Sequence, residues 1–136
     1  MNTITVHGNL TDEPTLRYSN TGTAVLRFAV AVTRRSYDRR SGEWVTRAPV
    51  FHRVVAFGTL AENAATLAKG TAVTIIGELA DDSWTTHTGQ TRRRVQLEAA
   101  DIAVSLRFAT AQITRNPREA DRAHTRDEHT GDGDQR

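Results

Sequence analysis

Apolar and polar residues alternate with a period of two along most of the first 110 residues, which is typical of half-buried β-strands. Residues 3–10 place Ile4, Val6 and Leu10 on one face, and residues 24–33 place a similar apolar row on one face. Further strands are expected over residues 48–57, 72–79, 83–86, 91–99 and 102–109. The pattern therefore predicts an all-β chain.

Turn residues and one helical segment separate these strands. Residues 36–43 are predicted to be a polar hairpin tip that Trp44 helps to close, and residues 87–90 a second hairpin turn. Leucine and alanine recur at helical spacing over residues 58–69, so one short helix is expected there. Gly77 inside a strand is typical of a bulge or sharp coil where a barrel closes. Five or six strands with this helix after the third outline an OB-fold, a five-stranded Greek-key barrel with long hairpin loops.

The strand over residues 48–57 has two faces that cannot both belong to the core. One face carries the small, mostly apolar residues Val50, His52, Val54 and Ala56. The other face carries Phe51, Arg53, Val55 and Phe57. An arginine between two phenylalanines suits a surface that stacks on flat rings and neutralises a phosphate between them. The alternative, that both phenylalanines are core residues, would require one strand of a small barrel to bury both faces.

Composition limits the chain to one folded domain and a short tail. With 136 residues, 38% of them hydrophobic, we expect one core within residues 1–110. Residues 111–136 contain few apolar side chains and are predicted to be a short C-terminal segment, largely disordered. The sequence has no cysteine, no long apolar run and no pattern of a secretory signal. We therefore expect a soluble cytoplasmic protein without a membrane span.

Arginine supplies almost all of the positive charge, with Lys69 as the single lysine. The excess lies in the predicted domain: residues 1–110 hold thirteen basic and ten acidic residues, and residues 111–136 hold five and six. Arginine forks onto phosphate and stacks on bases, which favours a nucleic-acid partner. A GC-rich genome would produce the same bias without any selection for binding.

Three stretches resemble the bacterial single-stranded DNA-binding protein family in order and spacing. They are T-I-T-V-H-G-N-L-T-D-E-P-T-L-R-Y-S-N-T-G, F-H-R-V-V-A-F-G-T-L-A-E-N-A-A-T-L-A-K-G, and G-E-L followed by S-W and a T-G-Q turn. The resemblance covers about residues 2–115, and residues 34–44 and 106–111 look like those of actinobacterial members. It implies an OB-fold that binds and protects single-stranded DNA in replication, recombination or repair, in a nucleoid-associated location.

The resemblance also implies which residues contact DNA. The base-stacking rings of relatives correspond here to Tyr37, Phe51, Phe57 and Trp84. Their phosphate contacts correspond to Arg53 and Lys69. Further arginines crowd the two predicted hairpins, namely Arg34, Arg35, Arg39, Arg40, Arg92, Arg93 and Arg94. Asp81 and Asp82 depart from the family pattern, and we expect their carboxylates to repel phosphate.

A homotetramer is the assembly that the resemblance implies. The predicted edge strand formed by Thr3, Ile4, Thr5, Val6 and His7 can pair with its own copy across a twofold axis. His52 is expected to be buried or near that contact, and residues 109–115 are the candidate strand that clasps a neighbouring subunit. The sequence ends H-T-G-D-G-D-Q-R, without the acidic, hydrophobic-capped tip with which replication members recruit partners. We therefore expect a short paralogue, or a shortened chain, that recruits no partner through such a tip.

Residue patterns that indicate catalysis are lacking in this sequence. We find no Ser-His-Asp order, no Gly-rich phosphate loop after a strand and no carboxylate pair that the fold would bring together. The sequence therefore predicts a binding protein that needs no metal or cofactor. The alternative function is an OB-fold adaptor, as in some primosome components, with protein partners and only secondary DNA contact. Exposed rings interleaved with arginine argue against a pure adaptor.

Overall fold

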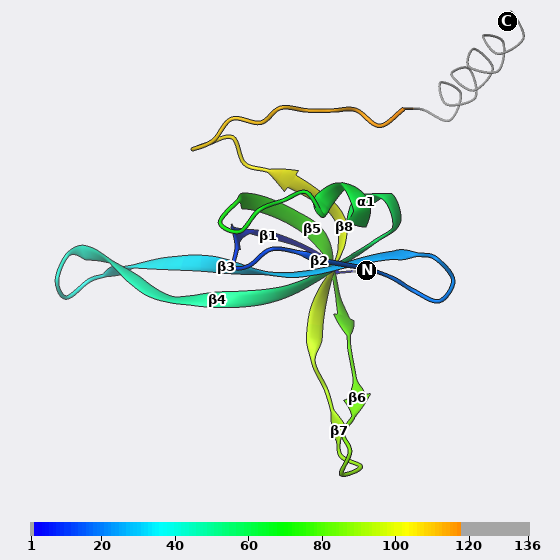
Figure 1. The fold of residues 1–136 in the computed structure, drawn as a ribbon. Coiled ribbons are helices and arrows are strands. Elements are labelled where there is room, and N and C mark those ends of the chain that lie inside the picture. Colours follow the sequence, from blue (N-terminus) through cyan, green and yellow to red (C-terminus); the bar gives the residue numbers. More distant parts are fainter. Residues whose placement is uncertain (1, 118–136) are drawn as a thin grey trace, which may run out of the picture.

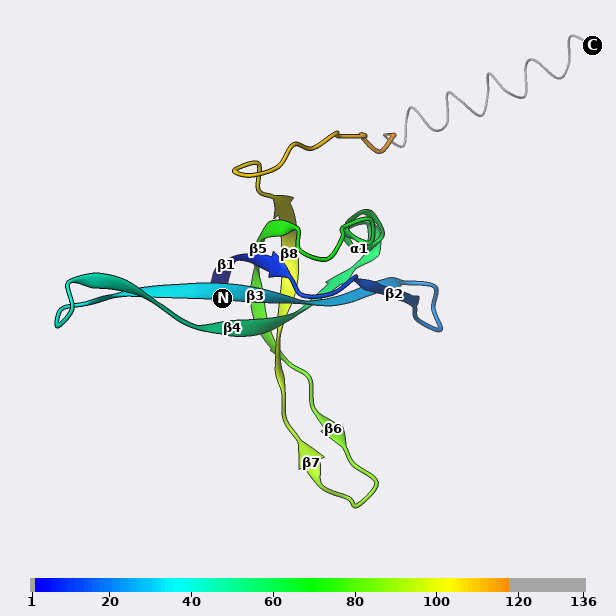
Figure 2. The same cartoon turned by 60° about the vertical axis from the view of Figure 1, so that its left-hand side comes forward.

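The computed structural model describes residues 2–117 and shows a small β-barrel from which two hairpins project in different directions (Figures 1 and 2). The elements in chain order are β1 (Thr3–Leu10), β2 (Thr15–Tyr18), β3 (Ala24–Asp38), β4 (Glu43–Phe57), α1 (Gly58–Ala64), β5 (Ala72–Asp81), β6 (Trp84–Thr85), β7 (Thr91–Arg92) and β8 (Val95–Val104). The main sheet has the order β1-β5-β8-β4-β3-β2. β1 also pairs with β3 through Asn9 and Leu10, so β1, β5, β8, β4 and β3 form a closed barrel. The expected OB-fold is confirmed.

Apolar positions with period two form the barrel core, as the alternation predicts. Val6 and Leu10 of β1 are buried, as are Leu26 and Val30 of β3, in one cluster with Ile75 of β5. This cluster lies inside the barrel, and the opposite faces of β3 and β4 are turned away from it. The barrel is therefore a rigid support for whatever side chains project outward.

The helix is shorter than the sequence predicts. α1 ends at Ala64, whereas a helix over residues 58–69 was expected. The backbone N–H of Leu67 donates to Ala64, a tighter turn than an α-helical one, and the Thr66 hydroxyl donates to the Asn63 carbonyl. Gly70, with a φ of 86°, then turns the chain into β5. A short alanine-rich helix persists only where it is packed, and α1 buries Ala61 and Ala64 against the barrel.

Each of the two strand pairs that extend into a projecting hairpin, β5–β8 and β3–β4, contains a register shift. Gly77 in β5 lies at a register shift, and a Cβ atom there would lie 2.1 Å from the Glu98 carbonyl oxygen. The bulge predicted at this glycine is confirmed. β3 and β4 shift register between Val32 and Arg34, where two residues, Ala48 and Pro49, face one residue of β3. Proline lacks the N–H that a continuous ladder needs, which explains its position at this bulge.

The prediction of a separate strand over residues 102–109 is wrong. Residues 102–104 complete β8, and residues 105–117 contain no strand. Pairing ends there because β5, the partner of β8, begins at Ala72, whose carbonyl accepts the Ser105 N–H. The predictions about disorder and about the terminal residues of the tail fall mainly on residues 118–136, which lie outside the described residues. None of the helices in the described part is long and apolar enough to cross a membrane.

Candidate nucleic-acid interface

The outer face of β3 and β4, made by the odd-numbered residues 25–31 and 51–57, carries exposed rings and arginines. Phe51 is 63% exposed and Phe57 45%, so neither belongs to the chain's core. Small residues of β3, Ala29 and Ala31, lie opposite Arg53 and Phe51 and leave these side chains uncovered. The predicted pattern of an arginine between two exposed phenylalanines is therefore present on this face.

Val55 is the member of this face that differs from the expectation of an exposed surface. It is 1% exposed, although the alternation places it between Arg53 and Phe57. β8 lies alongside β4 at this point in a parallel pairing, with Val55 opposite Glu98. The pairing with β8 divides the outer face into a Phe57 end and a Phe51–Arg53 end.

A groove joins the outer face to the root of the second hairpin. Its lining includes Arg27 from β3, Arg53 from β4, Arg94 just before β8 and Gln96 in β8, together with Asp12 and Glu13 from the loop after β1. Arg27 was not among the predicted site residues, yet it is exposed and lies on the same face as Arg53. Three guanidinium groups and two carboxylates line this groove, and Arg27 and Arg53, which form no ion pair among the described residues, are its candidate phosphate contacts.

The first hairpin, residues 33–48, continues this face beyond the bulge. Tyr37 and Trp44 lie directly opposite each other, with ring centroids 5.6 Å apart in an edge-to-face arrangement. Strict alternation from Phe51 would place Trp44 on the opposite side of β4. The extra residue at the bulge reverses the alternation, so Trp44 joins the side of Phe51 and Arg53. Sequence reasoning assigned Trp44 only to hairpin closure, and Pro49 within a strand was the signal for the bulge.

The arginines of the first hairpin divide between its two faces. The guanidinium carbon of Arg35 lies 6.0 Å from the centroid of the Trp44 ring. Arg34 lies opposite Arg47, so two like charges face each other on the other side of the ladder. Arg39 and Arg40 are exposed at the tip. Among the described residues, none of these arginines forms an ion pair with a carboxylate.

The second hairpin, residues 81–95, is shorter and carries Trp84, which is 44% exposed. Trp84 pairs with Arg92 across the ladder, and the Asp82 N–H donates to the Arg94 carbonyl at 2.8 Å. This register places Arg92 and Arg94 on the face of Trp84 and Arg93 on the other face. The three arginines that the sequence groups together therefore have different surroundings.

Asp82 and Arg94 form an ion pair in which the Arg94 Nε and Nη2 atoms both donate to Asp82 Oδ2, with Nε at 3.0 Å. The guanidinium carbon of Arg94 lies 4.7 Å from the centroid of the Trp84 ring. The repulsion expected from Asp82 is therefore offset locally by Arg94. Asp81 instead accepts a hydrogen bond from the Ser83 hydroxyl.

Other predicted site residues lie away from this face. The Lys69 N–H donates to a Glu13 carboxylate oxygen, which places Lys69 near the loop that follows β1. Thr3, Thr5 and His7 are exposed on β1, and His7 shares a hydrogen bond of 2.7 Å with the Thr74 hydroxyl of β5. Ile4 is half-buried and Val6 buried. His52 is half-buried opposite Val30, whose other neighbour is Leu10 at the end of β1.

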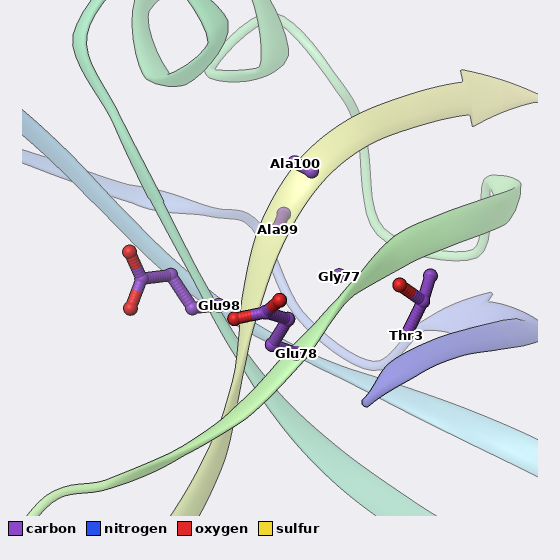
Figure 3. Close-up of a pocket in the computed structure, with 6 residues that line it drawn as sticks. All are labelled: Thr3, Gly77, Glu78, Glu98, Ala99 and Ala100. Atoms are coloured by element: carbon purple, nitrogen blue, oxygen red, sulfur yellow. The ribbon is translucent and has the colours of Figure 1, made fainter. Parts of the chain in front are cut away.

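A second depression of the barrel has the opposite charge. It is lined by Thr3, Gly77, Glu78, Glu98, Ala99 and Ala100, without a basic residue (Figure 3). Glu78 and Glu98 are cross-strand partners, so their carboxylates add negative charge at one place. The depression is therefore unsuited to phosphate, and the groove with three arginines remains the better candidate. Within residues 2–117 no group of three or more His, Asp or Glu residues could hold a metal ion.

Residues 1–105 match the single-strand binding protein family. The chain belongs to this family. "Single-stranded DNA-binding protein 1" of Tropheryma whipplei (strain Twist) is 46% identical over 114 residues, which cover 83% of this chain and 61% of that protein. "Single-stranded DNA-binding protein" of Mycobacterium leprae is 43% identical over 117 residues, covering 85% and 70%. These relatives confirm the resemblance to actinobacterial members. The chain spans less than two thirds of the Tropheryma protein.

Solved structures of the same fold agree with the family assignment. The crystal structure of the small single-stranded DNA-binding protein from Streptomyces coelicolor has a TM-score of 0.63 and 32% identity. The match covers 77% of this chain and 94% of that one. A structure described as "Plasmodium falciparum SSB complex with ssDNA" has a TM-score of 0.68 at 23% identity and is a likeness of fold.

Proposed function

We propose that this chain binds single-stranded DNA without marked sequence preference and protects it during replication, recombination or repair. The observation that carries the proposal is the outer face, on which the exposed rings of Phe51 and Phe57 lie on either side of Arg53 and Arg27, the arginines that line the neighbouring groove. Every base has a π-face, so stacking tolerates any sequence, and arginines along the path neutralise the backbone. Binding of this kind needs no catalytic group and no cofactor, and it is compatible with a cytoplasmic, nucleoid-associated location.

The stacking rings that we assign are Tyr37, Phe51, Phe57 and Trp84, with Trp44 added because the bulge brings it to the same face. Arg53 and Arg27 lie between Phe51 and the root of the second hairpin, where they can contact successive phosphates. The remaining candidate phosphate contacts are Lys69, the arginines of the first hairpin, Arg92 and Arg93. The path of the DNA therefore runs from the first hairpin across β3 and β4 to the second hairpin.

We also propose that four copies assemble, so that one long strand can contact several barrels. On the side of β1 away from β5, pairing within the described chain involves only Asn9 and Leu10, so the edge of residues 3–8 is available to a second copy. The exposed apolar side chain of Ile113, together with Leu106 and Phe108 just before residues 109–115, favours the subunit clasp expected there. Light scattering at micromolar concentration should return a tetramer, and truncation after Leu106 should loosen it. A monomer would contradict this assembly.

The test of DNA binding is a titration of the full chain with oligothymidylate, followed by tryptophan fluorescence. We expect strong quenching, because Trp44 and Trp84 both lie on the proposed path, and a steep loss of affinity with salt. A duplex oligonucleotide of the same length is the control and should quench far less. An OB-fold adaptor, the alternative function, would show little change with either DNA, and that result would overturn the proposal.

A further inference from the structure

The ring of Trp84 is held by a neighbour that is itself held by a carboxylate. Arg94 lies over the ring at 4.7 Å, and its Nε and Nη2 atoms both donate to one oxygen of Asp82. The backbone N–H of Asp82 also donates to the Arg94 carbonyl, so the two residues are fixed to each other twice. The hairpin register makes Trp84 and Arg94 diagonal neighbours on the same face.

The environment of this pair differs from that of the other hairpin arginines. Within residues 2–117 it is the single ion pair, and the side chains of Arg94 and Asp82 are only 34% and 28% exposed. A guanidinium that already meets a carboxylate carries little net charge toward an approaching phosphate. Its planar fork can still satisfy the carboxylate and lie over an aromatic ring at the same time.

We propose that Asp82 and Arg94 act as positioning residues that hold the Trp84 ring in the orientation in which it stacks on a base, and that Arg94 does not serve as a phosphate contact. The inference rests on the proposed DNA binding for its effect on affinity. The positioning itself is a property of the free protein. Arg94 also lines the groove with Arg53, so the positioned tryptophan lies next to a candidate phosphate contact.

Substitution of Asp82 distinguishes repulsion of phosphate from positioning of Arg94, because the two roles predict opposite changes in DNA affinity. If Asp82 only repelled phosphate, Asp82→Asn would tighten binding to oligothymidylate. If Asp82 positions Arg94, the same change should weaken binding about two- to fivefold, the size of one exposed cation–π contact. Asp81→Asn, the adjacent residue with the same charge, is the matched control and should not weaken binding. Tighter binding of Asp82→Asn would overturn the proposal.

Substitution of Arg94 separates positioning from charge. Lysine keeps the charge and still binds phosphate as a point charge, but it lacks the planar fork. We expect Arg94→Lys to lose the same two- to fivefold in affinity with an unchanged salt dependence. The double variant Asp82→Asn/Arg94→Met, which leaves the net charge unchanged, should behave likewise. Rescue by lysine, or a log–log salt slope about 0.7 shallower in the double variant, would identify a phosphate contact instead.

A measurement without DNA keeps the inference separate from the proposed function. In a Trp44→Phe background Trp84 is the only tryptophan, and its acrylamide quenching reports how freely the ring is exposed. Arg94→Lys and Asp82→Asn should both raise the quenching constant, whereas Asp81→Asn and Arg93→Lys should leave it unchanged. An unchanged constant in the first two variants would overturn the positioning role. Failure of the wild-type chain to bind oligothymidylate would instead contradict the proposed function and leave this readout valid.

Discussion

The two hairpins each place an arginine over an indole ring, but the surroundings of the two pairs differ. In the first hairpin Arg35 lies 6.0 Å from the Trp44 ring, and no carboxylate pairs with it among the described residues. In the second hairpin Arg94 lies 4.7 Å from the Trp84 ring and is paired with Asp82. Trp44 is 63% exposed and Trp84 44%. The same two residue types can therefore supply a charge without a carboxylate partner in one place and a ring beside an ion-paired arginine in another.

This difference shows that counting arginines overestimates the charge that is available to DNA. The sequence places four arginines on the first hairpin and three on the second, which suggests similar electrostatic roles. The structure leaves the first set without a carboxylate partner and neutralises one member of the second set. We therefore expect the salt dependence of binding to come mainly from the first hairpin and from Arg53.

The largest expected effect follows from removing the charge of the first hairpin. The variant Arg34→Gln/Arg35→Gln/Arg39→Gln/Arg40→Gln should make the log–log salt slope shallower by up to about 2.8, at about 0.7 for each phosphate that is no longer neutralised. The corresponding change in the second hairpin, Arg92→Gln/Arg93→Gln, should reduce it by at most about 1.4. Arg107→Gln, which follows β8 and lies beside His7 and Thr74 away from the proposed path, is the control for net charge and should leave the slope unchanged. A reduction from the second hairpin as large as that from the first would contradict the comparison.

The second effect concerns Trp84, whose ring lies beside the ion-paired Arg94. Trp84→Ala should weaken binding to oligothymidylate by about 1–3 kcal/mol and leave the thermal midpoint almost unchanged, because the side chain is exposed. Leu97→Ala, at a buried position of β8, is the opposite control and should cost about 2–5 kcal/mol of stability. Calorimetry and titration of both variants measure the two quantities separately. A Trp84→Ala protein that unfolds, while its folded fraction binds normally, would show that the tryptophan is structural.

The third effect concerns Trp44, whose neighbouring arginine has no carboxylate partner among the described residues. Trp44→Ala should weaken binding by about 1 kcal/mol, at the low end of the range for stacking. Part of the stacking energy must offset the loss of side-chain freedom when the ring is ordered on DNA. Val45→Ala, on the other face of the same hairpin, is the matched control and should bind normally. Loss of more affinity from Trp44→Ala than from Trp84→Ala would contradict the view that the ion-paired arginine makes Trp84 the stronger stacking residue.

Much of the barrel could be predicted, because the alternation of apolar and polar residues along each strand is a local pattern. Alternation identifies the buried faces of β1, β3 and β5. The single glycine inside β5 indicates the bulge, because the backbone of β8 approaches too closely for a Cβ atom there. The exposure of Phe51 and Phe57 also follows from alternation, since Val54 and Ala56 on the other face are buried. The end of β8 could not be predicted in this way, because it depends on where its partner β5 begins.

The parts of the site that sequence reasoning missed depend on register. Val55 is buried because β8, about forty residues later, lies alongside β4, and no local pattern shows this. The side of Trp44 depends on one extra residue at Ala48 and Pro49. The pair of Asp82 and Arg94 also depends on register. Counting outward from the predicted turn over residues 87–90 would place Asp82 opposite Val95, whereas in the structure Thr86 pairs with Gln90 and the hairpin is shifted by one residue.

The smallest expected effect comes from Asp81, which differs from Asp82 in that it has no arginine partner among the described residues. The alternation of the hairpin places Asp81 on the face opposite Trp84. Its carboxylate therefore acts on the DNA only through space, within a Debye length of about 10 Å at 0.1 M salt. Asp81→Arg should tighten binding at low salt and steepen the log–log slope by less than about 0.7. Asp101→Arg makes the same charge change on β8, beyond the bulge at Gly77, and should leave the slope unchanged. A slope that Asp81→Arg does not alter would mean that the DNA does not pass the start of the second hairpin.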